Sequence, residues 1–71
     1  MIQFQTTEQT SIVGKELRDI AFPRHVSISA IERGEDFITP SGSTVIEPGD
    51  FLYILTAAAQ KEALREILIH N

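Results

Sequence analysis

The segment "GEDFITPSGSTVIEPGDFLYIL", Gly34 to Leu55, carries the clearest structural signal in the sequence. Short extended segments at 36–39 and 44–46 are separated by turns rich in proline, glycine and serine. The tetrapeptide EPGD at 47–50 places proline and glycine where the two central positions of a type II turn favour them. The segment continues into FLYILT, residues 51–56, which is apolar on both of its alternating faces. This pattern predicts a central strand that is covered on both sides.

Two further strands are predicted from the alternation of apolar and polar residues. Residues 1–7, MIQFQTT, have one apolar face. Residues 26–32, VSISAIE, alternate in the same way, and the glycine-containing RGED at 33–36 joins them to the segment at 36–39. We therefore expect a β-hairpin here.

Two segments have helical periodicity. Residues 11–22 carry apolar side chains at spacings of four and three, with Ser11 as the expected N-cap and Pro23 as the stop. Residues 57–70 carry a second apolar stripe, made of Ala59, Ala63, Leu64, Ile67 and Leu68. His70 lies beside the expected helix C-terminus, where a partial positive charge is favourable. In residues 11–22 the apolar stripe consists of Val13, Leu17 and Ile20.

These elements predict a single α+β domain over residues 1–71, a small mixed or antiparallel sheet with two helices in the order β-α-β-β-β-β-α. Two helices cover one sheet face. Ile31, Ile38 and one side of 51–56 would then be wetted in a monomer, which forgoes about 1.5 to 3 kcal/mol for each large side chain. The sequence has no cysteine for a disulfide, so we expect a homodimer to bury this surface.

Composition narrows the range of partners. The formal charge of −4 disfavours nucleic acid, because the domain as a whole repels phosphate backbones. The sequence has neither an apolar run of about 18 residues nor a signal-peptide pattern, so we expect a soluble, cytoplasmic domain without direct membrane insertion.

Chemical motifs are weak, and no enzyme is predicted. His25 is interpreted as a solvated loop residue, and the hydroxyl groups of TPSGST, residues 39–44, as turn chemistry. Glu32, Glu35 and Asp36 cluster without the spacing of a calcium loop, so no metal is expected. The glycine patterns that bind mononucleotides and dinucleotides are absent.

Arg33 is the residue of most interest. It ends the strand 26–32, and its guanidinium can donate two parallel hydrogen bonds to a planar or phosphate ligand. The other interpretation is a surface arginine paired with Glu35 or Asp36, a contact worth about 0 to 1 kcal/mol. Both interpretations remain open at this point.

Several motifs in fixed order resemble one known family. They are I-x-R at Ile31–Arg33, I-x-P at Ile38–Pro40, P-S-G at 40–42 and E-P-G-D at 47–50, preceded by the G-K-x-L of Gly14–Leu17. Together they resemble the regulator of K+ conductance C-terminal domain, also called the TrkA-C domain. The resemblance covers nearly the whole chain.

The resemblance implies a dimeric regulatory domain on the cytoplasmic side of potassium channels, potassium uptake systems or cation/proton antiporters, often preceded by a Rossmann-like domain. Some members bind cyclic di-AMP at the dimer interface, and the positions matching their binding residues are Ile31, Arg33, Ile38 and Pro40. Phe37 stands where those members have a polar side chain. The domain carries no cofactor of its own under this interpretation. The alternative is a purely structural dimerisation domain without an effector.

Overall fold

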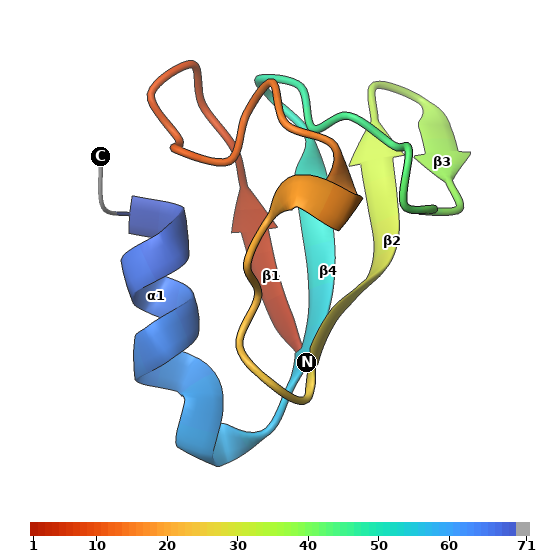
Figure 1. The fold of residues 1–71 in the computed structure, drawn as a ribbon. Helices are drawn as coiled ribbons and strands as arrows, with labels where there is room; N and C mark the ends of the chain where they lie inside the picture. The colour runs from red at the N-terminus through yellow and green to blue at the C-terminus, as the bar shows by residue number, and fades with distance from the viewer. Residues whose placement is uncertain (70–71) are drawn as a thin grey trace.

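The computed structural model describes residues 1–69. Its sheet is antiparallel, with the strands in the order β1-β4-β2-β3, and α1 follows the last strand along the chain (Figure 1). The elements are β1 (Ile2–Gln5), β2 (Val26–Arg33), β3 (Asp36–Ile38), β4 (Phe51–Thr56) and α1 (Lys61–Ile69), with short 3-10 turns at Leu17–Asp19 and Ala58–Gln60. The predicted α+β class and antiparallel sheet are confirmed.

The predicted hairpin forms from β2 and β3. Arg33 and Asp36 face each other across the turn, so two residues, Gly34 and Glu35, make the connection. Gly34 has φ 60°, and a positive φ at the first central position is what the turns of tight hairpins require. The glycine therefore sets the register that opposes Ile31 to Ile38.

A β-bulge in β2 overturns the predicted facing of Ile31. The pairing with β4 shifts between Ile28, opposite Ile54, and Ala30, opposite Tyr53. The extra residue reverses the alternation, because a shift of one residue moves every later side chain to the other face. Ile31 therefore points into the core and is fully buried, whereas the sequence pattern placed it on the open face.

The core lies on one side of the sheet. The loop between β1 and β2, together with α1, covers this side, and the opposite side has no covering element in residues 1–69 (Figure 1). Eight buried apolar side chains form the core cluster. They are Ile12, Ile20, Ile31, Ile46, Leu52, Ile54, Leu64 and Leu68.

The predicted helix over 11–22 is wrong. Gly14 has φ 88°, which does not fit a right-handed helix, and a 3-10 turn at Leu17–Asp19 is the only helical geometry in this range. Its backbone pairs instead with the segment around 42–46, through hydrogen bonds such as Gly14 N–H to Ile46 O at 2.8 Å. Pairing with a distant segment thus satisfies the donors that a helix would have used. Ser11, the expected cap, donates to the carbonyl of Ile67 on α1.

The short strand predicted at 44–46 is reduced to an isolated bridge between Glu16 and Val45.

The EPGD turn is confirmed: Gly49 has φ 87°, and the Asp50 N–H donates to Glu47 O at 3.2 Å. The closing helix is confirmed over Lys61–Ile69, with Leu64 and Leu68 buried. The role expected for His70 lies outside the described residues.

Candidate functional site

The best-defined polar arrangement joins Arg33, at the end of β2, to Asp50, immediately before β4. Arg33 Nε donates to Asp50 Oδ1 at 2.8 Å and Nη2 donates to Oδ2 at 2.7 Å, a bidentate pair. Nη2 also donates to the carbonyl of Val45 at 2.9 Å. Asp50 is fully buried, so the pair ties the hairpin to the loop that precedes β4.

The turn at 47–50 prepares Asp50 for this role. Its carboxylate accepts a hydrogen bond from the Glu47 N–H at 2.9 Å, and its carbonyl accepts one from the Thr6 N–H at 2.8 Å. The Thr6 hydroxyl donates to the Glu47 carbonyl at 2.7 Å. The turn is therefore fixed to the end of β1 as well as to β2.

The electrostatics follow from this geometry. Burial by itself would raise the pKa of Asp50, but the hydrogen bonds from Arg33 and from the Glu47 N–H outweigh it and lower the pKa below its ordinary value. The Asp50 hydrogen bond likewise raises the pKa of Arg33. Asp50 therefore stays ionised, and the guanidinium is held in one orientation.

Sequence reasoning identified Arg33 but not its partners. The surface pairing expected with Glu35 or Asp36 is wrong, because the guanidinium binds Asp50 and lies 3.1 Å from Glu47. Only the strand register, which the sequence does not reveal, brings these partners together. In the antiparallel β2–β4 ladder Glu32 opposes Phe51, so the next residue along β2 lies beside Asp50.

Two of the other three predicted site residues, Ile31 and Ile38, lie close to this pair in the hairpin, whereas Pro40 lies nearer the start of β2. Ile38 opposes Ile31 in the hairpin, and both lie on the core side of the sheet with Arg33, two residues beyond Ile31. Pro40 follows β3, is half-buried and lines a shallow hollow of about 340 Å³ with Phe22 and other residues. The structure therefore buries Ile31 completely and leaves the other three partly accessible.

The opposite face of the sheet is aromatic and uncovered. The Tyr53 ring lies 5.4 Å from that of Phe51 and 6.1 Å from that of Phe37, measured between centroids. Phe37 is 68% exposed and Leu55 47% exposed. The Tyr53 hydroxyl donates to Glu32 at 2.9 Å, which raises the pKa of Tyr53. The sequence-based expectation that one side of β4 stays open is confirmed.

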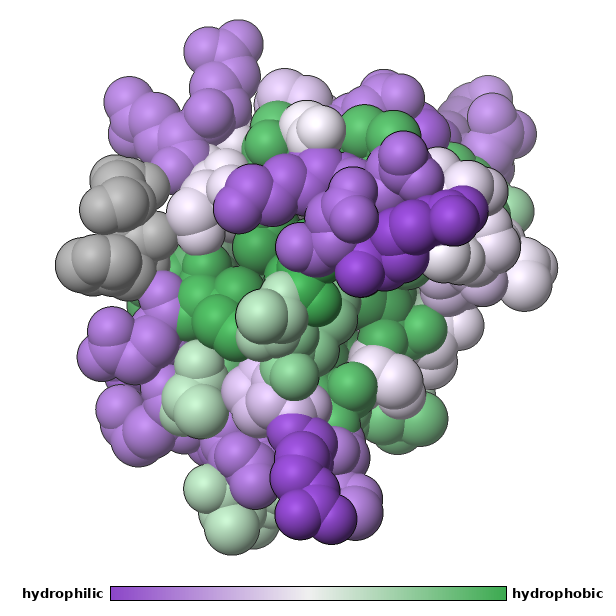
Figure 2. Space-filling model, in the orientation of Figure 1, coloured by the Kyte–Doolittle hydropathy of each residue, from purple (hydrophilic) through white to green (hydrophobic). Residues whose placement is uncertain are grey.

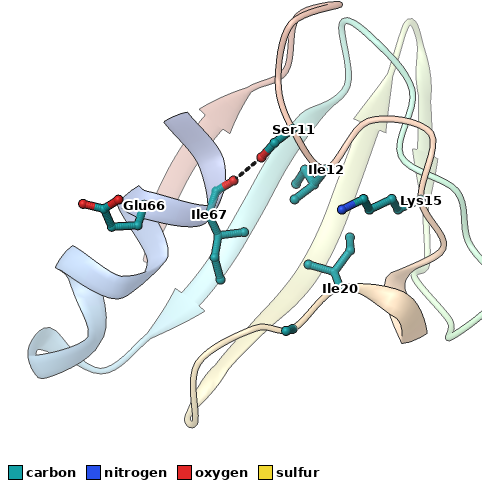
Figure 3. A pocket seen from close by; sticks show the side chains of 7 residues that line it. Ser11, Ile12, Lys15, Ile20, Glu66 and Ile67 are labelled. Carbon is teal, nitrogen blue, oxygen red and sulfur yellow. Dashed lines mark hydrogen bonds between the residues drawn. The ribbon is translucent and has the colours of Figure 1, made fainter. Parts of the chain in front are cut away.

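A second hollow, of about 410 Å³, lies between α1 and the loop before β2 (Figure 3). Ile12, Ile20 and Ile67 form its apolar wall, the Lys15 side chain turns toward its middle, and Glu66 turns away (Figure 3). Figure 2 shows apolar residues gathered in the centre of this face inside a hydrophilic rim. The core is thus incompletely closed on its covered side.

The candidates for catalysis or metal binding are dispersed. His25 is exposed in a loop, and the hydroxyls of Ser41, Ser43 and Thr44 are hydrogen-bonded to one another as turn chemistry. Within residues 1–69 no three acidic, histidine or cysteine side chains are grouped as a metal site would need. In the same range, no helix has both the length and the apolar character needed to cross a membrane.

Two curated proteins are similar to this chain in sequence. A Trk system potassium uptake protein TrkA homolog from Archaeoglobus fulgidus is 38% identical over 58 residues, covering 82% of this chain and 13% of the relative. The K(+)/H(+) antiporter NhaP2 of Shewanella baltica is 33% identical over 64 residues, covering 90% of this chain and 11% of the relative. The chain therefore spans only a small part of each relative's length.

A solved structure shows the same fold. The RCK_C domain dimer of S. agalactiae BusR, in complex with c-di-AMP, superposes with a TM-score of 0.70 at 24% identity, covering 92% of this chain and 88% of that one. The family model of the TrkA-C domain matches residues 1–69. The chain belongs to the TrkA-C domain family.

Proposed function

We propose that this domain regulates a protein that transports potassium or another monovalent cation, acts as a homodimer on the cytoplasmic side of the membrane, and responds to a small effector. The transport unit would be part of the same chain or of a partner chain, and the similar proteins include a Trk system potassium uptake protein homolog and a K(+)/H(+) antiporter. Residues 1–71 would form a single regulatory domain, two copies of which make the dimer, and no catalytic role is assigned to it.

The effector we propose is a cyclic dinucleotide. The observation that carries this proposal is the fixed guanidinium of Arg33 on the same side of the sheet as the partly accessible Ile38, with Pro40 in the hollow that follows β3. A charged fork with neighbouring apolar side chains suits a ligand that combines phosphate with flat bases. Ile31 would contribute from below by supporting Ile38, because its own side chain is buried. BusR, which shares the fold, was solved with c-di-AMP.

Regulation would work through linkage between ligand binding and the arrangement of the two copies. A ligand shifts an equilibrium only by its difference in affinity for the two states. A cyclic dinucleotide seated between two domains would favour one arrangement of the dimer, and the attached transporter would respond to that arrangement.

Titration calorimetry with cyclic di-AMP tests the proposal. We expect wild type to bind, and Pro40→Ala to weaken binding because it removes part of the apolar contact. Thr39→Ala is the matched control, since Thr39 is the exposed neighbour of Pro40. Binding that is unchanged in Pro40→Ala would contradict the assigned site, and wild type that binds no cyclic dinucleotide would contradict the effector.

A purely structural dimerisation domain is the second candidate. The uncovered aromatic face of the sheet favours it, because exposed Phe37 and Leu55 gain by burial against another copy without any ligand. Sedimentation velocity at micromolar concentration separates the two ideas. A dimer in which no cyclic dinucleotide raises the melting temperature supports the structural role, and a strictly monomeric species contradicts both.

A further inference from the structure

The Arg33 guanidinium uses its Nε and Nη2 donors within the domain. A guanidinium has five N–H groups, one on Nε and two on each terminal nitrogen. Nε and Nη2 donate to Asp50, and Nη2 also donates to the Val45 carbonyl. Nη1 is the remaining nitrogen, and Glu47 Oε2 lies 3.1 Å from it. An external anion would therefore approach the guanidinium at Nη1, beside the Glu47 carboxylate.

We propose that Glu47 is an internal competitor, whose carboxylate lies at Nη1, the nitrogen that an anionic ligand group would bind, and weakens the binding of that group to Arg33. This inference rests on the proposed function, in which Arg33 contacts the phosphate of a cyclic dinucleotide. It assigns to Glu47 the role of setting how strongly that site binds anions.

The two carboxylates at Arg33 differ in a way that suits this division of roles. Asp50 is buried and makes a bidentate pair, so releasing it would strand a charge in the interior. The Glu47 side chain is 56% exposed, and in residues 1–69 its carboxylate contacts a cation only at Nη1 of Arg33. Exposed pairs of this kind contribute little and are weakened by salt. Glu47 can therefore be displaced while Asp50 keeps the guanidinium in position.

Competition predicts selectivity as well as affinity. A neutral ligand offers nothing to replace the Glu47 carboxylate at Nη1, whereas a phosphate restores a charge-assisted hydrogen bond. The site is thereby biased toward anions that bind more strongly than a carboxylate on a flexible side chain.

The variant Glu47→Gln tests this directly, because it removes the charge and keeps the length of the side chain. The matched control is Glu35→Gln, which makes the same change of net charge at the exposed hairpin turn. Two probes are titrated separately, inorganic phosphate and cyclic di-AMP, and binding is followed by the NMR signals of the Arg33 guanidinium. We expect Glu47→Gln to bind both about two- to fivefold more tightly than wild type. Glu35→Gln should differ from wild type by less than about twofold.

Each outcome has a definite consequence. If Glu47→Gln binds phosphate no more tightly than wild type, or no more tightly than Glu35→Gln, Glu47 does not compete and the inference is overturned. The same holds if phosphate leaves the Arg33 signals unchanged in every variant. If phosphate binding tightens in Glu47→Gln while cyclic di-AMP binds no variant, the competitor role stands and the proposed effector is wrong.

Discussion

Replacing Asp50 with asparagine removes one buried charge and leaves the size of the side chain almost unchanged. The carboxylate accepts two hydrogen bonds from Arg33 and one from the Glu47 N–H. Asparagine has a single acceptor oxygen, so at least one of these bonds is lost, and its NH₂ group then faces the guanidinium. Asp50→Asn therefore breaks the connection between the hairpin and the turn at 47–50.

The loss of unfolding free energy in Asp50→Asn depends on how exposed the Arg33 side chain is. Removing one member of a buried pair costs about 3 to 5 kcal/mol when the other charge is left in the interior. The Arg33 side chain is 31% exposed and lies near Glu47, so part of its charge stays solvated and paired. We therefore expect a loss of about 2 to 3 kcal/mol, which corresponds to a fall in melting temperature of roughly 10 to 20 °C for a domain of this size.

Thermal and urea unfolding followed by circular dichroism measure this loss. The control is Asp36→Asn, since Asp36 opposes Arg33 across the hairpin but is exposed. A double-mutant cycle with Arg33→Ala and Asp50→Ala should give a coupling of about 1 to 3 kcal/mol. Asp50→Asn that unfolds within about 0.5 kcal/mol of Asp36→Asn would refute the argument that this buried pair holds the site together.

The remaining predictions concern acid and the turn. The folded-state pKa of Asp50 is lowered, so its contribution to stability is present above the unfolded value of about 3.9 and is lost as the pH falls through the folded value. The gap in unfolding free energy between wild type and Asp50→Asn should accordingly narrow below about pH 4 in urea titrations at several pH values, and a gap constant down to pH 2 would contradict the assigned ionisation. Gly49→Ala should cost about 1 kcal/mol, because φ is 87° and no atom lies near the added methyl group. Gly42→Ala, at a residue without positive φ, should cost less in the same denaturant assay, and equal costs would argue against backbone strain.

The sheet could be predicted from sequence because its signals are local. The alternation in residues 1–7, the glycine at position 34 and the proline–glycine pair at 48–49 each act within a few residues. The closing helix also carries its own periodic stripe, ending in Leu64 and Leu68 at the core. These elements formed where the sequence placed them.

The helix expected over 11–22 failed for a non-local reason. The predicted stripe does face the core, since Ile20 is buried and Val13 and Leu17 pack against it, but Gly14 and pairing with 42–46 redirect the backbone. The bulge in β2 is similar. A single extra residue near Ser29 decides which face Ile31 occupies, and the alternation of side chains alone does not reveal an inserted residue.

The site was predicted in part for the same reason. Arg33 could be selected because it lies at a strand end next to a glycine turn, and its guanidinium can donate two parallel hydrogen bonds to a ligand. Its partner Asp50 lies 17 positions away in the sequence and is brought close only by the order of strands, with β4 rather than β3 beside β2 along most of its length. The residue type therefore indicated that Arg33 can bind a carboxylate or phosphate, but only the strand order shows that Asp50 is its partner.

The buried pair also determines which variants can report on a ligand. From sequence, Arg33→Ala is the natural choice for separating a regulatory from a structural domain. The structure argues against it, because removing the guanidinium strands the Asp50 carboxylate in the interior and destabilises the fold whether or not an effector exists. A loss of binding in that variant would therefore be ambiguous. Glu47 lies beside the guanidinium without holding it in place, and Pro40 lies in the hollow that follows β3, so changes at either residue alter the ligand's surroundings while the Arg33–Asp50 pair stays intact.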